Sequence, residues 1–286
     1  MVNTHTPTLP GPIVDTAWLA AHLSDVTVVD GTYFLPIHQR DAAEEFVARH
    51  IPGAVRFDID AIKDPSNPLP HMVPGPQAFA EAVGALGLGS DRPVVVYDGH
   101  GLMSAARVWW MLRLYGHDAV AVLDGGLPKW LAEGRPVESG VAPRTPRAFH
   151  ATERPNLLAD ADTVAAALVS RSAQVVDVRA ADRFAGSAPE PRPGIRSGHM
   201  PDARNLPFTR FLAPDQTLLP PDKILAAFQA AGIDPDQPVI ASCGSGVTAC
   251  VAALALATTG RWDTVVYDGS WAEWGSDPRR AVVSDV

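Results

Sequence analysis

One cysteine lies where a reactive thiol would be expected, after a buried strand and before a glycine-rich turn. Cys243 follows the apolar residues 239–242 and precedes Gly-Ser-Gly at 244–246, after which residues 247–258 have the composition of a buried helix. The glycines let the backbone curl so that several N–H groups point to one place, and the start of a helix adds its dipole there. Such a loop stabilises an anion, so we expect Cys243 to hold a thiolate or a persulfide.

The second cysteine and the histidines show no comparable pattern. Cys250 falls among alanines and valines inside the expected helix, and we interpret it as an inert core residue, which is also the alternative for Cys243. Two cysteines cannot form a disulfide scaffold or a zinc ribbon, the nine histidines lack metal-ligand spacing, and no Gly-Lys-Ser/Thr phosphate motif occurs. We therefore predict neither a metal site nor a cofactor.

The elements that position Cys243 belong to an internal repeat. Four short stretches of the first half recur in the same order about 145 residues later, among them residues 93–99 at 238–244. Asp98 takes the place of Cys243 in the first copy, so that copy cannot carry out the same thiol chemistry and is expected to form one wall of a cleft. Two repeats of this length indicate duplicated domains.

Each copy alternates strand-like and helix-like segments. Short β-branched runs bounded by Asp or Gly predict buried strands, and the longer segments between them predict helices. The predicted strands are residues 26–30, 94–97, 119–123, 174–178, 239–242 and 264–267, and the predicted helices are 16–23, 76–86, 103–115, 162–169, 222–231 and 247–258. This alternation predicts an α/β fold with a parallel sheet flanked by helices in each copy, and ligands in such sheets bind beyond the carboxyl ends of the strands.

Length and charge narrow the remaining possibilities. The 286 residues suggest about two domains, which we place at 10–140 and 159–280 with a Pro-rich linker at 139–158. The net charge of -9 argues against nucleic-acid or membrane-surface partners, and no apolar run is long enough to span a bilayer. Residues 1–12 contain neither Lys nor Arg, so we expect no leader peptide, and the low cysteine count favours the cytoplasm.

A tandem repeat with a cysteine loop only in its second copy resembles the tandem-domain rhodanese superfamily, over about residues 10 to 280. The loop itself is similar to that of the 3-mercaptopyruvate sulfurtransferases, and the resemblance implies that its residues surround the substrate. They are Cys243, Gly244, Ser245, Gly246, Val247 and Thr248. Thiosulfate-using members typically have Arg and Lys after the cysteine. Charge favours the same choice, because thiosulfate is a dianion that gains from adjacent cations, whereas mercaptopyruvate has one carboxylate and one ketone.

The resemblance also implies which side chains bind the substrate. Arg183 and Arg192 match the arginines that hold the carboxylate and keto oxygen of mercaptopyruvate, and both lie in a Gly/Pro-rich stretch that we expect to be a loop at the carboxyl edge of the sheet. A guanidinium binds a carboxylate through two parallel hydrogen bonds, which a lysine cannot do. The alternative is that these arginines pair with a carboxylate such as Glu190 or Asp182.

Ser245, His71 and Asp60 match a Ser–His–Asp chain that has been proposed to act in the same family. Such a chain would pass a proton to the departing enolate or orient the substrate. The alternative for His71 is a loop histidine bonded to the backbone, and for Asp60 a cap or a turn.

Four other residues are interpreted as structural. His50 and His199 occur at the same place in both copies, including the copy without the cysteine. Arg179 is expected to hold the loop that carries Arg183, and Arg196 is expected to face solvent.

These observations predict a two-domain sulfurtransferase with its active site between the domains. It would move sulfur from 3-mercaptopyruvate through a Cys243 persulfide to cyanide, a small thiol or a thioredoxin-like protein, and release pyruvate. The alternatives are a thiosulfate sulfurtransferase and a non-catalytic sulfur-relay module. A cysteine phosphatase is disfavoured, because residues 247–249 lack the arginine that ends a phosphatase loop.

Overall fold

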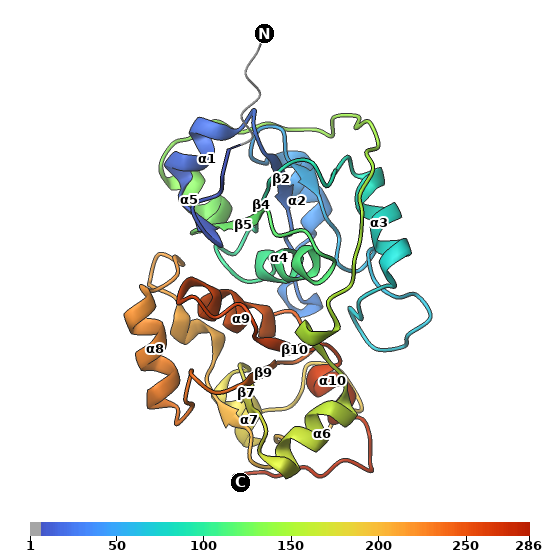
Figure 1. Ribbon diagram of the computed structural model, residues 1–286, viewed down its shortest axis with the longest axis vertical. Helices are drawn as coiled ribbons and strands as arrows, with labels where there is room; N and C mark the ends of the chain where they lie inside the picture. Colours follow the sequence, from blue (N-terminus) through green and yellow to red (C-terminus); the bar gives the residue numbers. More distant parts are fainter. Residues whose placement is uncertain (1–6) are drawn as a thin grey trace. The chain divides into compact units, whose positions relative to one another are not determined.

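Each copy of the repeat forms one five-stranded sheet in which all strands run parallel (Figure 1). The structure is a computed structural model that describes residues 7–286, so the prediction about a leader at residues 1–12 lies partly outside the described residues. The strand order is β1-β5-β4-β2-β3 in the first sheet and β6-β10-β9-β7-β8 in the second. The two orders correspond strand by strand, which confirms the duplication and the α/β class.

The first unit contains the copy with Asp98. Its strands are β1 (Ile13–Val14), β2 (Thr27–Asp30), β3 (Val55–Arg56), β4 (Val94–Tyr97) and β5 (Val120–Leu123). Its helices are α1 (Thr16–His22), α2 (Ala42–Ala48), α3 (Pro76–Ala85), α4 (Ala105–Leu114) and α5 (Gly126–Ala132), with a short 3-10 helix η1 (Pro36–His38).

The second unit contains the copy with Cys243. Its strands are β6 (Leu158–Ala159), β7 (Gln174–Asp177), β8 (Arg204–Asn205), β9 (Val239–Ser242) and β10 (Val265–Tyr267). Its helices are α6 (Ala161–Ser170), α7 (Ala181–Ala185), α8 (Pro221–Ala230), α9 (Ala249–Thr258) and α10 (Ser270–Trp274), with 3-10 helices η2 (Pro155–Leu157) and η3 (Phe208–Phe211).

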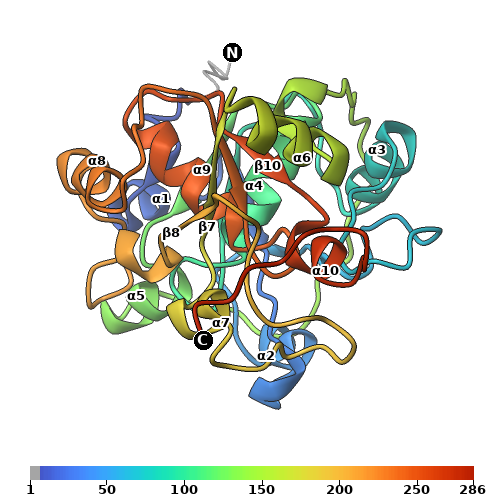
Figure 2. The same ribbon diagram turned by 90° about the horizontal axis from the view of Figure 1, so that it is seen from below.

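Helices cover both faces of each sheet, which is why the central strands are apolar throughout. On one face of the second sheet, Ile240 of β9 and Tyr267 of β10 pack with Val164 of α6 and Trp271 of α10. The other face is covered by α9, whose residues from Ala249 to Ala257 are all buried, and α8 lies beside α9 in both ribbon views (Figure 2). The cysteine loop is therefore fixed between a buried strand and a buried helix.

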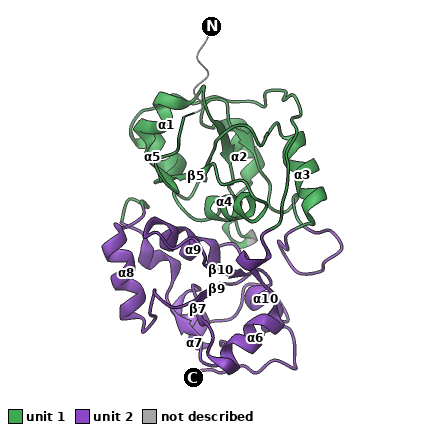
Figure 3. Ribbon diagram, viewed as in Figure 1, with its two compact units in different colours: residues 1–63, 74–153, 214–217 green, residues 64–73, 154–213, 218–286 purple. Residues whose placement is uncertain are grey.

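The chain divides into its two units with one exchange of segments (Figure 3). The first unit comprises residues 1–63, 74–153 and 214–217, and the second comprises 64–73, 154–213 and 218–286. Residues 64–73 thus belong with the second unit although they come from the first half of the sequence. Among the described residues, no helix is long and apolar enough to cross a membrane. The domain limits 10–140 and 159–280 stay a prediction.

The predicted elements differ from the observed ones mainly at the sheet edges. The six predicted strands are confirmed to within one residue at each end, and the six predicted helices to within two. The sequence patterns missed β1, β3, β6 and β8, which have two residues each and are too short for an apolar period. They also missed α2, α5, α7 and α10, helices of five or seven residues.

Candidate active site

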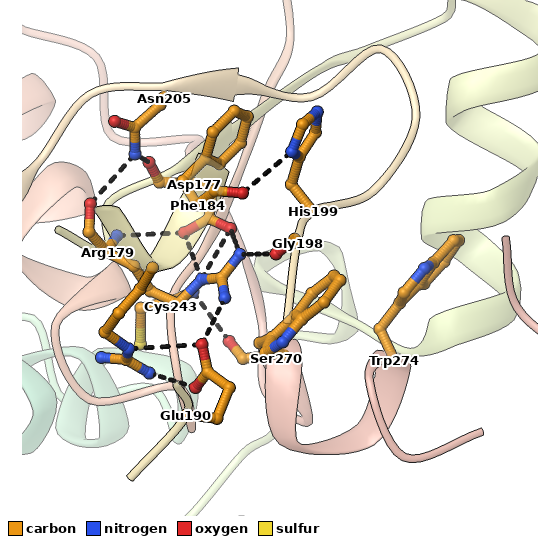
Figure 4. Close-up of polar contacts among 12 residues, drawn as sticks. Asp177, Arg179, Phe184, Glu190, Gly198, His199, Asn205, Cys243, Ser270 and Trp274 are labelled. Atoms are coloured by element: carbon orange, nitrogen blue, oxygen red, sulfur yellow. Dashed lines mark hydrogen bonds and ion pairs between the residues drawn. The ribbon is translucent and has the colours of Figure 1, made fainter. Parts of the chain in front are cut away.

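Cys243 is held at the carboxyl end of β9 by backbone hydrogen bonds to α10. The Cys243 N–H donates to Ser270 Oγ at 3.0 Å (Figure 4). The Ser270 hydroxyl donates to the Tyr267 carbonyl at 2.7 Å. The carbonyl of Cys243 accepts from the Trp271 N–H at 2.9 Å, and that of Gly244 accepts from Ala272 at 2.9 Å. With 2% of its surface exposed, Cys243 is buried.

The first copy shows what a loop of this kind does with an anion. The carboxylate of Asp98 accepts hydrogen bonds from the backbone N–H groups of His100, Gly101, Met103 and Ala105, at 2.9, 3.0, 2.7 and 2.8 Å. The loop after β4 therefore gathers its N–H groups around a negative charge. Cys243 takes the place of Asp98 in the second copy, at the start of the corresponding loop.

The two loops share a glycine with positive φ three residues after their first residue. Gly101 has φ 113° and Gly246 has φ 75°, a region that side chains with a Cβ rarely adopt. The loops differ in length, because α4 begins at Ala105 whereas α9 begins at Ala249, one residue earlier in the repeat. The backbone curl expected from the glycines is present in both copies.

Arg183 lies against Gly244, the residue after Cys243 in the cysteine loop. A Cβ atom at Gly244 would lie 3.1 Å from Nη2 of Arg183, so the guanidinium occupies the space beside the loop that a side chain would need. Arg183 comes from the helix α7, which corrects the expectation that residues 183–192 form a loop throughout. Gly186, with φ 88°, ends this helix, and the loop begins only after it.

Glu190 pairs with Arg183 and is itself anchored by a second arginine. Arg183 donates from Nη2 to Glu190 Oε2 at 2.5 Å and from Nε to Oε1 at 3.3 Å. Arg179 donates from Nη1 to Glu190 Oε1 at 2.8 Å, and its Nε and Nη2 contact both oxygens of Asp177 (Figure 4). We call Asp177, Arg179, Arg183 and Glu190 the arginine–carboxylate cluster. Its pairing of Arg183 with Glu190 is the alternative that the sequence left open.

Arg179 is the fixed point of this cluster. Its side chain is fully buried, donates from Nη2 to the Gly198 carbonyl at 2.9 Å and stacks over the Trp271 ring at 4.3 Å. Burial by itself would lower the pKa of Arg179, but the adjacent carboxylates of Asp177 and Glu190 outweigh it and raise the pKa. The expectation that Arg179 holds the neighbouring loop agrees with these contacts.

Arg192 contacts His71, which lies in the segment 64–73, distant from it in the sequence. The Nη2 atom of Arg192 lies 3.3 Å from Nε2 of His71, and the Val73 N–H donates to Asp268 Oδ2 at 2.8 Å, which ties the segment to the second unit. An arginine can only donate, so His71 Nε2 accepts and the imidazole is assigned as neutral, with its proton on Nδ1. His71 is buried and has φ 62°, a backbone conformation that only the surrounding packing can maintain.

The other candidates are placed as follows. Ser245 and Val247 are buried in the cysteine loop, and Thr248 is the N-cap of α9. Asp60 lies in the first unit, in a turn where its carboxylate is 3.9 Å from Lys63 Nζ. The second unit therefore holds Cys243, Ser245, His71 and both candidate arginines, and Asp60 belongs to the other unit.

Arg196 corrects a prediction, since it does not face solvent. It is half-buried and donates to the carbonyls of Trp274, Gly275, Asp277 and Arg280. Five donors on one planar group can cap several carbonyls of a chain turn at once, and this explains why the arginine is drawn inward. It fastens the segment after α10.

The remaining predicted structural residues have equivalent surroundings in the two copies. His50 Nδ1 lies 2.8 Å from the Phe46 carbonyl and its ring stacks on Phe46, while His199 Nδ1 lies 2.9 Å from the Phe184 carbonyl and its ring stacks on Phe184. Cys250 is buried in α9 with its thiol 3.2 Å from the Gly246 carbonyl. These contacts support a structural role for all three.

Two site residues were missed by the sequence reasoning. Ser270 and Asp268, which fasten Cys243 and the 64–73 segment, lie in the repeated stretch 266–270. Its match to residues 122–126 was a signal of the repeat, but it contained no sign of a role at the cysteine.

Comparison with known proteins agrees with this geometry. A model of the rhodanese-like domain matches residues 15–133 and 160–277. The human protein named 3-mercaptopyruvate sulfurtransferase is 44% identical over 276 residues, which is 94% of this chain and 93% of the relative. A Cricetulus griseus protein named thiosulfate sulfurtransferase is 43% identical over 271 residues, covering 92% and 91%. The crystal structure of SseA from Escherichia coli matches with a TM-score of 0.84 at 39% identity, covering 91% of this chain and 99% of that one.

Proposed function

The chain belongs to the rhodanese family, and from the geometry of its second copy we infer how it acts on sulfur. It is a 3-mercaptopyruvate sulfurtransferase, as its similarity to enzymes of that name over nearly the whole chain indicates. The observation that carries the mechanism is the position of Cys243 at the start of the loop that corresponds to the Asp98 loop, with the Arg183 guanidinium against the next residue.

The reaction divides into two transfers, each with balanced electrons. The Cys243 thiolate attacks the sulfur of mercaptopyruvate and forms an S–S bond. The electron pair of the broken C–S bond goes to the pyruvyl group, which leaves as its enolate and takes a proton to become pyruvate. A nucleophilic acceptor then attacks the outer sulfur, and the thiolate of Cys243 is restored. A covalent intermediate of this type predicts ping-pong kinetics.

The two arginines supply the groups that hold the donor. We assign the substrate carboxylate and keto oxygen to Arg183 and Arg192, because a guanidinium fork matches two adjacent oxygens. Arg183 is about one-quarter exposed, at 23%, so its side chain retains access to a ligand. The residues from Gly244 to Thr248 would line the transferred sulfur through their backbone N–H groups.

We assign the transfer of a proton to the departing enolate to a chain of Ser245, His71 and Asp60. The burial of Ser245 and His71 within the same unit supports this proposal. The place of Asp60 in the chain rests on the resemblance alone. In a version that uses Ser245 and His71 alone, the proton released by the S–H group of mercaptopyruvate would pass through them to the enolate.

Thiosulfate is the second candidate donor, and the Cricetulus griseus relative named for that activity favours testing it. For the acceptor we propose cyanide, a small thiol or a thioredoxin-like protein. We place the reaction in the cytoplasm, which is consistent with thiols that form no disulfide in the described part of the chain.

Turnover and intact mass together test the proposal. The wild-type protein should release pyruvate from mercaptopyruvate and, without an acceptor, gain about 32 Da, the mass of one sulfur atom, on Cys243. Cys243→Ser should lose both signals, and Cys250→Ser is the matched control that keeps them. Appreciable turnover by the Cys243→Ser variant would refute the assignment of the nucleophile.

A further inference from the structure

The carboxylate of Glu190 is the unusual member of the arginine–carboxylate cluster. Asp177 is buried at the end of β7 and forms an ion pair with Arg179, which is equally buried. Glu190 is also nearly buried, with 3% of its side chain exposed, yet it faces Arg183, the guanidinium that lies against the cysteine loop. A carboxylate on this guanidinium occupies donors that a substrate carboxylate would otherwise use.

We infer that Glu190 positions Arg183 and determines which sulfur donor the site prefers. This inference rests on the proposed function. Glu190 fixes the guanidinium against Gly244, and its charge cancels one of the positive charges beside the cysteine loop. A donor with one negative charge then suits the site better than a dianion. Glu190 acts through Arg183 and is a positioning residue.

The positioning follows from a chain of contacts that begins in the core. Arg179 is fixed by Asp177, Gly198 and the Trp271 ring, and it holds Glu190 Oε1 at 2.8 Å. Glu190 in turn contacts Arg183 through both oxygens, at 2.5 and 3.3 Å. A two-point contact of this kind restricts rotation of the guanidinium as well as its distance. A partly exposed arginine without such a contact would sample many rotamers.

The effect on donor choice follows from charge. Arg179 and Arg183 carry two positive charges and Asp177 and Glu190 carry two negative ones, so the cluster is neutral. Replacing Glu190 by glutamine leaves one net positive charge. One unit of charge at about 7 Å, with an effective dielectric constant of about 30, changes the binding of each unit of ligand charge about tenfold. A dianion carries two units of charge, so its binding improves by this factor twice, whereas the binding of a monoanion improves by it once.

The test is the ratio of kcat/KM for thiosulfate to kcat/KM for mercaptopyruvate. Glu190→Gln should raise this ratio about tenfold, while the loss of positioning lowers kcat/KM for mercaptopyruvate. Glu190→Asp keeps the charge but shortens the side chain, so kcat/KM should fall for both donors with little change in their ratio. Added salt should reduce the ratio in Glu190→Gln more than in the wild-type protein.

Asp182→Asn is the matched control. It removes one negative charge from α7, the helix that carries Arg183. Asp182 is exposed, and its carboxylate accepts from the Arg183 backbone N–H. Its donor ratio should stay near the wild-type value. An unchanged ratio in Glu190→Gln, or an equal change in Asp182→Asn, would overturn the inference.

Folding and the proposed function are checked separately. If Glu190→Gln does not fold, Glu190→Asp carries the test, and a shifted donor ratio in that variant refutes the role of the charge. Pyruvate release by the wild-type protein and its loss in Cys243→Ser report on the proposed function alone. If the wild-type protein is active but the ratio of kcat/KM values does not respond to substitution of Glu190, only the inference is rejected.

Discussion

The Asp98 loop offers the sharpest test of the idea that these loops gather N–H groups around an anion. Replacing Asp98 by asparagine keeps the shape and removes the charge. Of the four N–H donors that now reach the carboxylate, the single amide oxygen of asparagine can serve about two, and the amide NH₂ group faces the others. The side chain is completely buried, so water cannot replace the lost acceptors.

The magnitude follows from the two hydrogen bonds lost. Each hydrogen bond to a charged group contributes about 1.5–3 kcal/mol, and a buried donor left unsatisfied costs a similar amount. We therefore expect Asp98→Asn to lower the free energy of unfolding of the first unit by about 3 kcal/mol, or its Tm by roughly 10 °C.

Urea unfolding followed by circular dichroism measures this loss, and hydrogen exchange of the amides of residues 100–105 localises it. Asp41→Asn is the matched control, because Asp41 is an exposed N-cap that accepts two backbone N–H groups and asparagine caps helices equally well. Its stability should be nearly unchanged. The reasoning is refuted if Asp98→Asn unfolds within about 0.5 kcal/mol of the wild type, or if the exchange of residues 100–105 does not accelerate.

Three further changes have expected outcomes. Arg192→Lys should lower kcat/KM for mercaptopyruvate at least about tenfold, since a lysine cannot make the two-point contact, and unchanged steady-state kinetics would remove Arg192 from the proposed site. Cys250→Ala should keep the persulfide mass on Cys243 and full turnover; loss of that mass would transfer the chemistry to Cys250. The Thr16 hydroxyl, followed by Arg135, lowers the pKa of Glu133 to about 2. A lowered pKa stabilises the fold above the ordinary value of 4.5, and this contribution disappears as the pH falls from there toward 2. Glu133→Gln should flatten the pH dependence of urea unfolding in that range, and equal slopes for the two proteins would disprove it.

The central architecture could be predicted because it has a local signature. Strands such as β4 and β9 are buried on both faces, so they appear as short apolar runs between polar residues. The outer strands could not be predicted, because two residues contain no period. The helix α7 was also missed, since five residues before a Gly/Pro-rich stretch resemble a loop and its stability comes from packing of Phe184 in the core.

The candidate site divides in the same way. Cys243 has a local motif, with a strand before it and glycines and a helix after it, and this motif is sufficient to single it out. The contact of Arg192 with His71 joins residues 121 positions apart, and the exchange of residues 64–73 into the second unit leaves no trace in composition or period. The sequence left open whether Arg183 pairs with a carboxylate such as Glu190, and in the structure Glu190 pairs with both Arg179 and Arg183.

The duplicated loops explain why one copy suits chemistry and the other does not. Asp98 brings its own carboxylate to the N–H groups of its loop, so their hydrogen bonds are made within the chain. A thiol at the same place supplies a charge only when it ionises or carries a second sulfur. The loop of Cys243 would therefore stabilise the charge that returns to its sulfur when an acceptor takes the outer sulfur, and this favours the second transfer rather than merely the binding of a substrate.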